Sequence, residues 1–324
     1  MLQLAIVGLG NWGKRLVDSA QGKSSTVRFA TAVVGRPEPA ADFARTHGLA
    51  VSTDYAAVLA DPAIGGIVSC GPAPLHAEHS LAALKAGKPV LAIKPMATNE
   101  ADALAMKAAA NKAGVLLALG YNRCFYPNVA ELRRRLKAGA LGRLLHSEGD
   151  FCVHRYGETK AGDWKADPAH VTAGSLADHM LYLTIETLGP MVEAYTLAQR
   201  DVSDNRLADV AAVMLKSAAG QSALLTAIGM TPDFYRFQVF GVKGWVEIRG
   251  SRHFTFQPQE GEREDIRFPE IDAERAEVEA FAAAATGEAP FPVSPEDAVH
   301  GVAVLAAMGR SAAEGGIVRV QSNG

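Results

Sequence analysis

The order of apolar and amphipathic segments in the first part of the chain constrains the fold more than any other feature. Short apolar runs alternate there with segments of about ten residues that have the composition of helices. This alternation is typical of βαβ units, and it predicts a doubly wound parallel sheet that helices cover on both faces. The expected strands are residues 2–7, 27–34, 66–70, 89–93 and 115–119, and the expected helices are residues 14–21, 40–47, 76–86 and 100–113.

The pattern changes after about residue 123. Segments with β character follow one another there, separated by turn residues such as Gly220, Lys243-Gly244 and Gly250. Adjacent strands without intervening helices predict an open, mainly antiparallel sheet in an α+β domain. The expected strands are residues 144–155, 192–199, 210–217, 222–230, 237–248, 253–257 and 317–320, and the expected helices are residues 174–188 and 295–313.

The composition excludes several classes of protein. With 48% hydrophobic and 21% charged residues, the chain is ordinary for a soluble globular protein. Its net charge of −3 argues against a nucleic-acid partner. No apolar run reaches the roughly 18 residues of a membrane span, and the start of the chain does not look like a signal peptide. Three cysteines without a C-x-x-C pair predict a reducing, cytoplasmic location.

A glycine-rich segment, Gly8-Leu9-Gly10-Asn11-Trp12-Gly13, lies between the first expected strand and the first expected helix. In that context the pattern G-x-G-x-x-G indicates a dinucleotide-binding loop. Gly8 allows the tight turn, Gly10 lets the backbone approach a pyrophosphate, and Gly13 allows close packing of helix on strand. Asn11 and Trp12 belong to the same loop, whose free N–H groups at the helix N-terminus are expected to face the phosphates.

The end of the second expected strand bears on which dinucleotide is bound. NAD enzymes usually carry Asp or Glu about 20 residues after the glycines, where it accepts hydrogen bonds from the ribose 2′-OH. This chain has Gly35-Arg36 there, and a guanidinium can pair with a 2′-phosphate. We therefore expect NADP in preference to NAD. The alternative is that Arg36 is a solvated surface residue.

Further segments carry recognisable motifs. Ile67–His76 contains a P-x-x-x-H turn, Ala86–Pro95 reads AGKPVLAIKP, and Gly120–Pro127 reads GYNRCFYP. Trp164-Lys165 is followed by the G-x-L-x-D pattern of residues 174–178. Taken together, these motifs resemble those of the glucose–fructose oxidoreductase, inositol dehydrogenase and MocA (Gfo/Idh/MocA) family over nearly the full length of the chain.

The resemblance implies a fold and a function. Residues 1–123 are expected to form an NADP-binding Rossmann domain, and residues 124–324 a domain for substrate binding and oligomerisation. The helix at about 295–313 either stays in the second domain or packs back toward the first. The implied activity is hydride transfer between NADP and a hydroxyl or carbonyl group of a sugar, polyol or related cyclic alcohol. A homodimer or homotetramer through the C-terminal sheet is also implied.

The resemblance also assigns residues to the site. Pro72, His76 and Lys94 are expected to contact the cofactor, in addition to the glycine loop and Arg36. The expected contacts to the small-molecule substrate are Asn122, Trp164, Lys165 and His179. No metal site is expected, because His76 and His79 lack the H-E-x-x-H spacing of a zinc protease and no third ligand is evident.

Three residues are predicted to carry the proton chemistry. Asp178 and Tyr182 are four residues apart and share one face of a helix, whereas His179 lies about 100° further round. Lys94 follows a parallel strand at the carboxyl edge, where open α/β sheets bind ligands. A tyrosine with an ordinary pKa near 10 needs a neighbouring cation to lower it. Lys94 can supply that charge, and Asp178 can orient the tyrosine.

The chain departs from the family pattern at three positions. Ile93 stands where the family has Glu, Met180 where it often has Gly, and Tyr182 where it often has His. A non-catalytic NAD(P)-binding sensor of the same fold is therefore an alternative to the enzyme. Reduction of a carbonyl or imine group in a non-sugar metabolite would use the same residues and also stays open.

Overall fold

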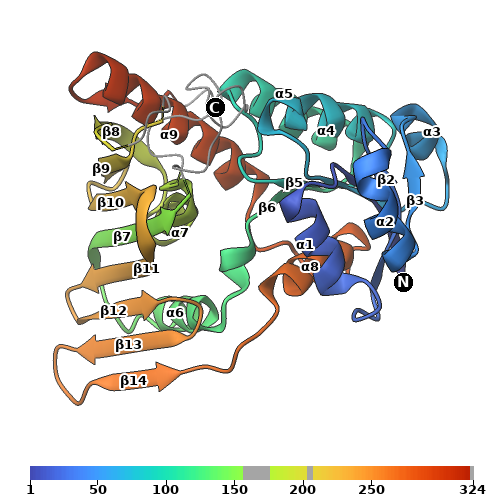
Figure 1. The fold of residues 1–324 in the computed structure, drawn as a ribbon. Helices are drawn as coiled ribbons and strands as arrows, with labels where there is room; N and C mark the ends of the chain where they lie inside the picture. The colour runs from blue at the N-terminus through green and yellow to red at the C-terminus, as the bar shows by residue number, and fades with distance from the viewer. Residues whose placement is uncertain (156–175, 203–206, 322–324) are drawn as a thin grey trace. The chain divides into compact units, whose positions relative to one another are not determined.

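The computed structural model describes residues 1–155, 176–202 and 207–321 (Figure 1). The chain divides into two compact units, each of which is described by itself. The first contains Met1–Asn122 and Asp272–Val299, and the second contains Arg123–Ile271 and His300–Gly324.

The first unit is built on a six-stranded parallel sheet with the order β3-β2-β1-β4-β5-β6. This confirms the predicted parallel sheet of βαβ units. Figure 1 shows α4 and α5 on one face of the sheet and α1, α2 and α8 on the other. The strands are β1 Leu2–Val7, β2 Val27–Val33, β3 Ala50–Ser52, β4 Gly66–Ser69, β5 Val90–Ile93 and β6 Leu117–Gly120, and the helices between them are α1 Asn11–Ala20, α2 Glu38–His47, α3 Tyr55–Ala60, α4 His76–Lys85 and α5 Glu100–Ala113.

The strand order reverses beside β1. The chain runs from β1 outward to β2 and β3, and then crosses to β4 on the other side of β1. At such a switch point the loops after the two central strands diverge, and ligands of open α/β sheets bind in the crevice this leaves. The Cys70 N–H donates to the Val7 carbonyl oxygen (2.8 Å), which joins the carboxyl ends of β4 and β1 directly.

Helix α8 (Ala273–Ala285) was not expected from the sequence, although Asp272 caps its N-terminus by accepting from the Arg275 N–H (2.9 Å). It packs on α1 and β2, so residues 272–299 belong to the first unit. Its buried face joins the core of that unit with side chains from the sheet, α1 and α2. The members from α8 are Val278, Phe281 and Ala282.

The second unit is built on a nine-stranded mixed sheet with the order β14-β13-β12-β11-β7-β10-β9-β8-β15. All neighbours are antiparallel except β7 and β10, which confirms the predicted, mainly antiparallel sheet. The strands are β7 Leu144–His154, β8 Met191–Gln199, β9 Val210–Ser217, β10 Ser222–Ile228, β11 Met230–Gly241, β12 Gly244–Arg249, β13 His253–Pro258, β14 Glu264–Arg267 and β15 Val318–Arg319. Residues 237–248 form a hairpin of β11 and β12, because the backbone reverses at Val242-Lys243.

Helices α6 (Pro127–Lys137) and α7 (Asp178–Leu188) pack on one face of this sheet. Helix α9 (Pro295–Glu314) crosses the boundary between the units at Val299. Gly149 of β7 lies against Met180 of α7, so its neighbours Glu148 and Asp150 point to the opposite face, which we call the outer face.

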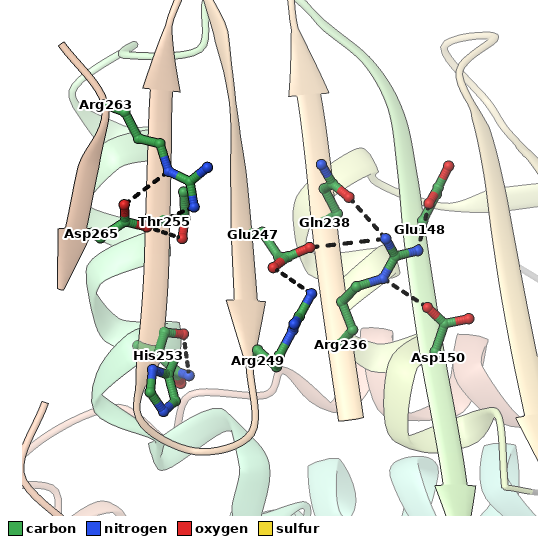
Figure 2. A network of polar contacts seen from close by, with 11 residues as sticks. Glu148, Asp150, Arg236, Gln238, Glu247, Arg249, His253, Thr255, Arg263 and Asp265 are labelled. Carbon is green, nitrogen blue, oxygen red and sulfur yellow. Dashed lines mark hydrogen bonds and ion pairs between the residues drawn. The ribbon is translucent and has the colours of Figure 1, made fainter. Parts of the chain in front are cut away.

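A network of charges lies on the outer face (Figure 2). The Arg236 guanidinium donates to Asp150 (2.8 Å) and Glu148 (2.7 Å) of β7, and Glu247 of β12 lies 3.9 Å away. Arg249 pairs with Glu247 at 3.1 Å. Because one arginine lies among several carboxylates, its removal would leave them facing each other across neighbouring strands.

A buried acid lies where α8 meets α1 in the first unit. Glu277 is fully buried, and neither of its carboxyl oxygens has a hydrogen-bond partner in the described part of the chain. One turn earlier, Glu274 pairs with Arg15 of α1 at 2.6 Å. Burial raises the pKa of Glu277 well above its usual range, and the charge of Glu274 raises it further. Both effects favour the neutral form of Glu277 in the folded protein.

This predicts a pH-dependent effect of Glu277→Gln. Above its ordinary pKa, the unfolded chain releases the Glu277 proton while the folded chain keeps it, so the wild type loses stability as the pH rises, by up to about 1.4 kcal/mol per pH unit. Glutamine has the shape of the neutral acid and does not titrate. The variant should therefore gain stability over the wild type as the pH rises. Urea denaturation at several pH values measures this.

Glu279→Gln is the matched control, because it removes a carboxylate from the same helix at a partly exposed position. A difference between Glu277→Gln and the wild type that stays constant with pH would contradict a neutral Glu277.

Candidate functional site

The glycine loop has the close backbone contacts that its sequence predicts. Gly8 has a φ of +95°, and a Cβ atom placed on it would lie 2.6 Å from the backbone nitrogen and Cα of Gly71. A Cβ atom on Gly13 would collide with the carbonyl oxygen of Gly8. A Cβ atom on Gly10, by contrast, would meet no protein atom within 4 Å. The loop is therefore packed against the protein at Gly8 and Gly13, and its backbone is open at Gly10.

The N-terminus of α1 is suited to bind an anion. Gly10 is the N-cap and supplies no side-chain cap, and the first turn contains no acidic residue. The first N–H groups of the helix can thus donate hydrogen bonds to a ligand. The helix dipole favours negative charge at the same place. Helix α1 begins at Asn11, three residues earlier than expected, so Asn11 and Trp12 lie in this first turn. These features fit the pyrophosphate of a dinucleotide.

Arg36 lies at the carboxyl edge of the same sheet. It is exposed and lies between β2 and α2, two residues before the first residue of the helix. Glu38, the first residue of α2, is exposed too, so a carboxylate follows Arg36 by two residues in the chain. The structure records no ion pair of Arg36 with any residue it describes.

The turns after β4 and β5 hold the remaining predicted residues of the first unit. Pro72 is exposed, whereas His76 is buried with its ring nitrogens 2.9 Å from the carbonyl oxygens of Gly71 and Pro95. Lys94 is half-buried, and its backbone N–H donates to the Gly120 carbonyl oxygen (3.1 Å). Asn122 is buried and its side-chain amide donates to Glu274 of α8 (3.3 Å).

The three predicted residues of α7 are all buried in the second unit. His179 Nε2 lies 3.9 Å from the Asp178 carboxylate, and the His179 ring lies 4.2 Å from that of Phe151 in β7. The two side chains thus approach each other, although successive helix positions point about 100° apart. A histidine beside a carboxylate in a buried setting can hold or pass on a proton.

Tyr182 faces α9. A Cβ atom on Gly301 would collide with the Tyr182 ring, so the absence of a side chain at Gly301 makes room for it. Burial raises the pKa of Tyr182, and the charge of Asp178 raises it further. The phenol therefore keeps its proton unless a bound group lowers its pKa.

A cluster around Arg123 was not predicted. The Arg123 guanidinium lies 4.7 Å from the Phe151 ring and 5.3 Å from the Tyr235 ring, within range of cation–π attraction. Phe151 is the same residue that contacts His179. The partners come from β7 and β11, and no local sequence signal links these strands. The predicted substrate contacts Trp164 and Lys165 lie outside the described residues.

No group of three or more His, Cys, Asp or Glu side chains among the described residues could hold a metal ion. No helix within residues 1–155, 176–202 and 207–321 has the length and apolar character needed to span a membrane.

Comparison with known proteins adds to this geometry. Levoglucosan dehydrogenase of Pseudarthrobacter phenanthrenivorans is 34% identical over 133 residues, which cover 41% of this chain and 32% of the relative. Inositol 2-dehydrogenase of Mycolicibacterium smegmatis is 33% identical over 160 residues, which cover 48% of this chain and 44% of the relative. Each match therefore spans less than half the length of the curated relative.

A solved structure extends the similarity. The aldose–aldose oxidoreductase of Caulobacter crescentus, complexed with glycerol, superposes with a TM-score of 0.86. It is 26% identical, and the match covers 98% of this chain and 99% of that one.

Two family models match successive parts of the chain. Residues 2–121 match the NAD-binding Rossmann fold of the GFO/IDH/MocA oxidoreductase family, and residues 129–247 match that family's C-terminal domain. The first match falls on the parallel sheet and the second on strands of the mixed sheet. The chain therefore belongs to the Gfo/Idh/MocA family of oxidoreductases.

Proposed function

We propose that this protein is an NADP-dependent oxidoreductase that transfers hydride between NADP and a hydroxyl or carbonyl group of a sugar, polyol or related cyclic alcohol. The observation that carries the proposal is the glycine loop. Gly8 and Gly13 pack tightly there, and the first N–H groups of α1 have no side-chain cap and can donate to a ligand. The relatives named as inositol and levoglucosan dehydrogenases support the class of substrate.

The loop and Arg36 would hold the dinucleotide. Backbone N–H groups from Gly10 onward would bind the pyrophosphate, and Arg36 would pair with the 2′-phosphate. Pro72 and Lys94 would flank the nicotinamide end. A bound nicotinamide supplies the hydride acceptor or donor, and the chain's own residues must then move the substrate's hydroxyl proton.

Proton transfer is assigned to Lys94, Asp178 and Tyr182. The Tyr182 phenol would receive or give the proton, the Lys94 ammonium would lower its pKa, and Asp178 would orient it. Asn122, Trp164, Lys165 and His179 would contact the substrate. The contact between Asp178 and His179 favours a second assignment, in which His179 takes the proton and Asp178 stabilises its charged form.

The burial of Tyr182 also favours a second candidate function, a sensor that binds NAD(P) without turnover. A panel of inositols, levoglucosan, aldoses and non-sugar carbonyl compounds, assayed by nicotinamide absorbance with NADP and NAD separately, distinguishes the two. Turnover of a polyol or sugar supports the enzyme. Binding of NADP without turnover, with an affinity that a sugar changes, supports the sensor, and reduction of a non-sugar carbonyl only would change the substrate class.

We also propose that copies of the chain pair through the outer face of the nine-stranded sheet. Apolar side chains are exposed on β8, β9 and β10, with Leu197 59%, Met214 53% and Leu224 41% exposed. Met214 and Leu224 lie directly opposite each other on β9 and β10, and Leu224 is paired in turn with Glu148 of the Arg236 network on β7. An apolar patch with a polar rim is typical of a protein interface.

Met214→Glu should therefore convert a dimer or tetramer to the monomer, because it places a charge in the apolar part of that face. Light scattering coupled to size exclusion measures the mass. Val242→Glu is the control, since Val242 is exposed to a similar extent in the turn after β11. A monomeric wild type, or equal dissociation by both variants, would refute this interface.

Arg36→Ala should weaken NADP binding by about 10–100-fold, because it removes a charge-assisted contact worth about 1.5–3 kcal/mol. NAD binding should barely change. Calorimetry with both dinucleotides measures the two affinities. Glu38→Gln is the matched control, and a gain of NADP affinity there is expected since it removes a nearby negative charge. Equal NADP and NAD affinities in the wild type would overturn the cofactor assignment.

Tyr182→Phe should lower kcat by about 10²–10⁴-fold, the usual contribution of general acid–base catalysis, with little change in NADP affinity. Lys94→Ala should lose activity to a similar extent, and His179→Ala should have a mild effect. Steady-state kinetics with the best substrate of the panel measures the pattern. The reverse pattern, full activity in Tyr182→Phe and collapse in His179→Ala, would transfer the proton to the Asp178–His179 pair.

A further inference from the structure

His76 has a position that the cofactor contact expected for it does not explain. It is the first residue of α4, only 3% exposed, and both ring nitrogens face backbone carbonyl oxygens. Nδ1 lies 2.9 Å from the Pro95 oxygen, and Nε2 lies 2.9 Å from the Gly71 oxygen. Since carbonyl oxygens only accept, the ring donates to one of them when neutral and to both when protonated. The ring therefore lies between two turns and contacts both.

The first of these turns supports the nucleotide loop. Gly71 follows β4, and its backbone lies against Gly8 so closely that a Cβ atom on Gly8 would be 2.6 Å away. The backbone N–H of the preceding residue, Cys70, donates a hydrogen bond to the carbonyl oxygen of Val7 at the end of β1. A shift of Gly71 would thus displace Gly8 and, with it, the N-terminus of α1.

The second turn carries Lys94. Pro95 is the next residue, and the Lys94 backbone is held on its other side by the hydrogen bond to Gly120. Hydrogen bonds therefore hold the chain on both sides of the Lys94 side chain, at the Lys94 N–H by Gly120 and at the Pro95 oxygen by His76.

We propose that His76 is a positioning residue that ties the Gly71 turn, on which the nucleotide loop rests, to the Lys94–Pro95 turn. One ring would thereby place the dinucleotide and the lysine relative to each other within the first unit. The catalytic consequence rests on the proposed function of Lys94, whereas the link between the turns does not.

The surroundings of the ring agree with a role in which it is not itself a proton carrier. Burial lowers the pKa of His76, the carbonyl groups of Pro95, Gly71 and Ile93 partly oppose this, and the neighbouring His79 lowers it again. The lowered pKa favours the neutral ring, which is held by contacts on both edges.

Two substitutions separate the two contacts. The amide of asparagine reaches the place of Nδ1, so His76→Asn keeps the bond to Pro95 and loses that to Gly71. The amide of glutamine reaches the place of Nε2, so His76→Gln keeps Gly71 and loses Pro95. NADP affinity, measured by calorimetry, reports on the Gly71 turn. The rate of reductive methylation of the Lys94 amine, measured by peptide mass spectrometry, reports on the Lys94 turn.

The expected result is a split. His76→Asn should raise the Kd for NADP by about 3–10-fold, the effect of one hydrogen bond, with the Lys94 methylation rate within about twofold. His76→Gln should change the methylation rate several-fold and leave the Kd within about twofold. Melting temperatures check that the variants fold. His47→Gln is the matched control, because His47 ends α2 at the opposite edge of the sheet.

The proposal would be overturned if His76→Asn and His76→Gln changed the Kd for NADP and the Lys94 methylation rate equally. It would also be overturned if neither variant changed either quantity, and His76 would then be a packing residue. If neither variant folds, hydrogen exchange in the wild type decides. Peptides covering Gly71 and Lys94 should both slow on NADP binding, and slowing at Gly71 alone would refute the link. None of these measurements needs turnover, so an inactive wild type would refute the proposed enzyme and leave this test intact. Absence of dinucleotide binding would refute both.

Discussion

The close approach of two backbone turns at the carboxyl ends of β1 and β4 is the constraint on which the first unit depends. Gly8 and Gly71 leave no room for a side chain between them, and Gly13 leaves none between α1 and Gly8. This packing places the start of α1 at the carboxyl edge of the sheet, beside the switch in strand order, and the Gly10 N-cap leaves its first N–H groups without a side-chain cap. The positions of His76, Lys94 and Pro95 follow from the same edge, since each lies in a turn that begins where β4 or β5 ends.

The first unit is completed by a helix that comes about 150 residues later in the chain. Helix α8 covers the part of the sheet next to α1, and it brings with it a buried acid and a salt bridge. Arg15 and Glu274 form an ion pair, whereas Glu277 is enclosed, and burial raises its pKa and favours the protonated acid. Helix α1, which begins at the nucleotide loop, thus packs against a helix that contains a buried acid. Asn122 joins the same contact through Glu274, which ties the end of β6 to α8.

The predicted site residues of α7 lie in two different electrostatic surroundings, one around Asp178 and His179 and one around Tyr182. His179 lies 3.9 Å from the Asp178 carboxylate and packs on Phe151, whose ring also contacts Arg123. Tyr182 lies one turn away against Gly301, in surroundings that hold its proton firmly. Proton transfer through Tyr182 thus requires a change in its surroundings when ligands bind. Transfer through His179 requires less, because a carboxylate is already close to its ring.

The sequence alone determined the parallel sheet, the glycine loop and the mainly antiparallel second sheet, because each depends on local patterns: apolar periodicity, glycine spacing and turn residues. It also identified most of the residues of the first unit's carboxyl edge, since parallel strands end there by topology. Helix α8 and the hairpin at residues 237–248 were missed even though Asp272 and Lys243-Gly244 signalled them. Only the tertiary structure decided that His76 lies between Gly71 and Pro95, that Glu277 is enclosed, and that Tyr182 faces Gly301 while His179 approaches Asp178. These facts depend on which distant segments of the chain cover a side chain. Periodicity can be recognised from neighbouring residues in the sequence, but burial by distant segments cannot.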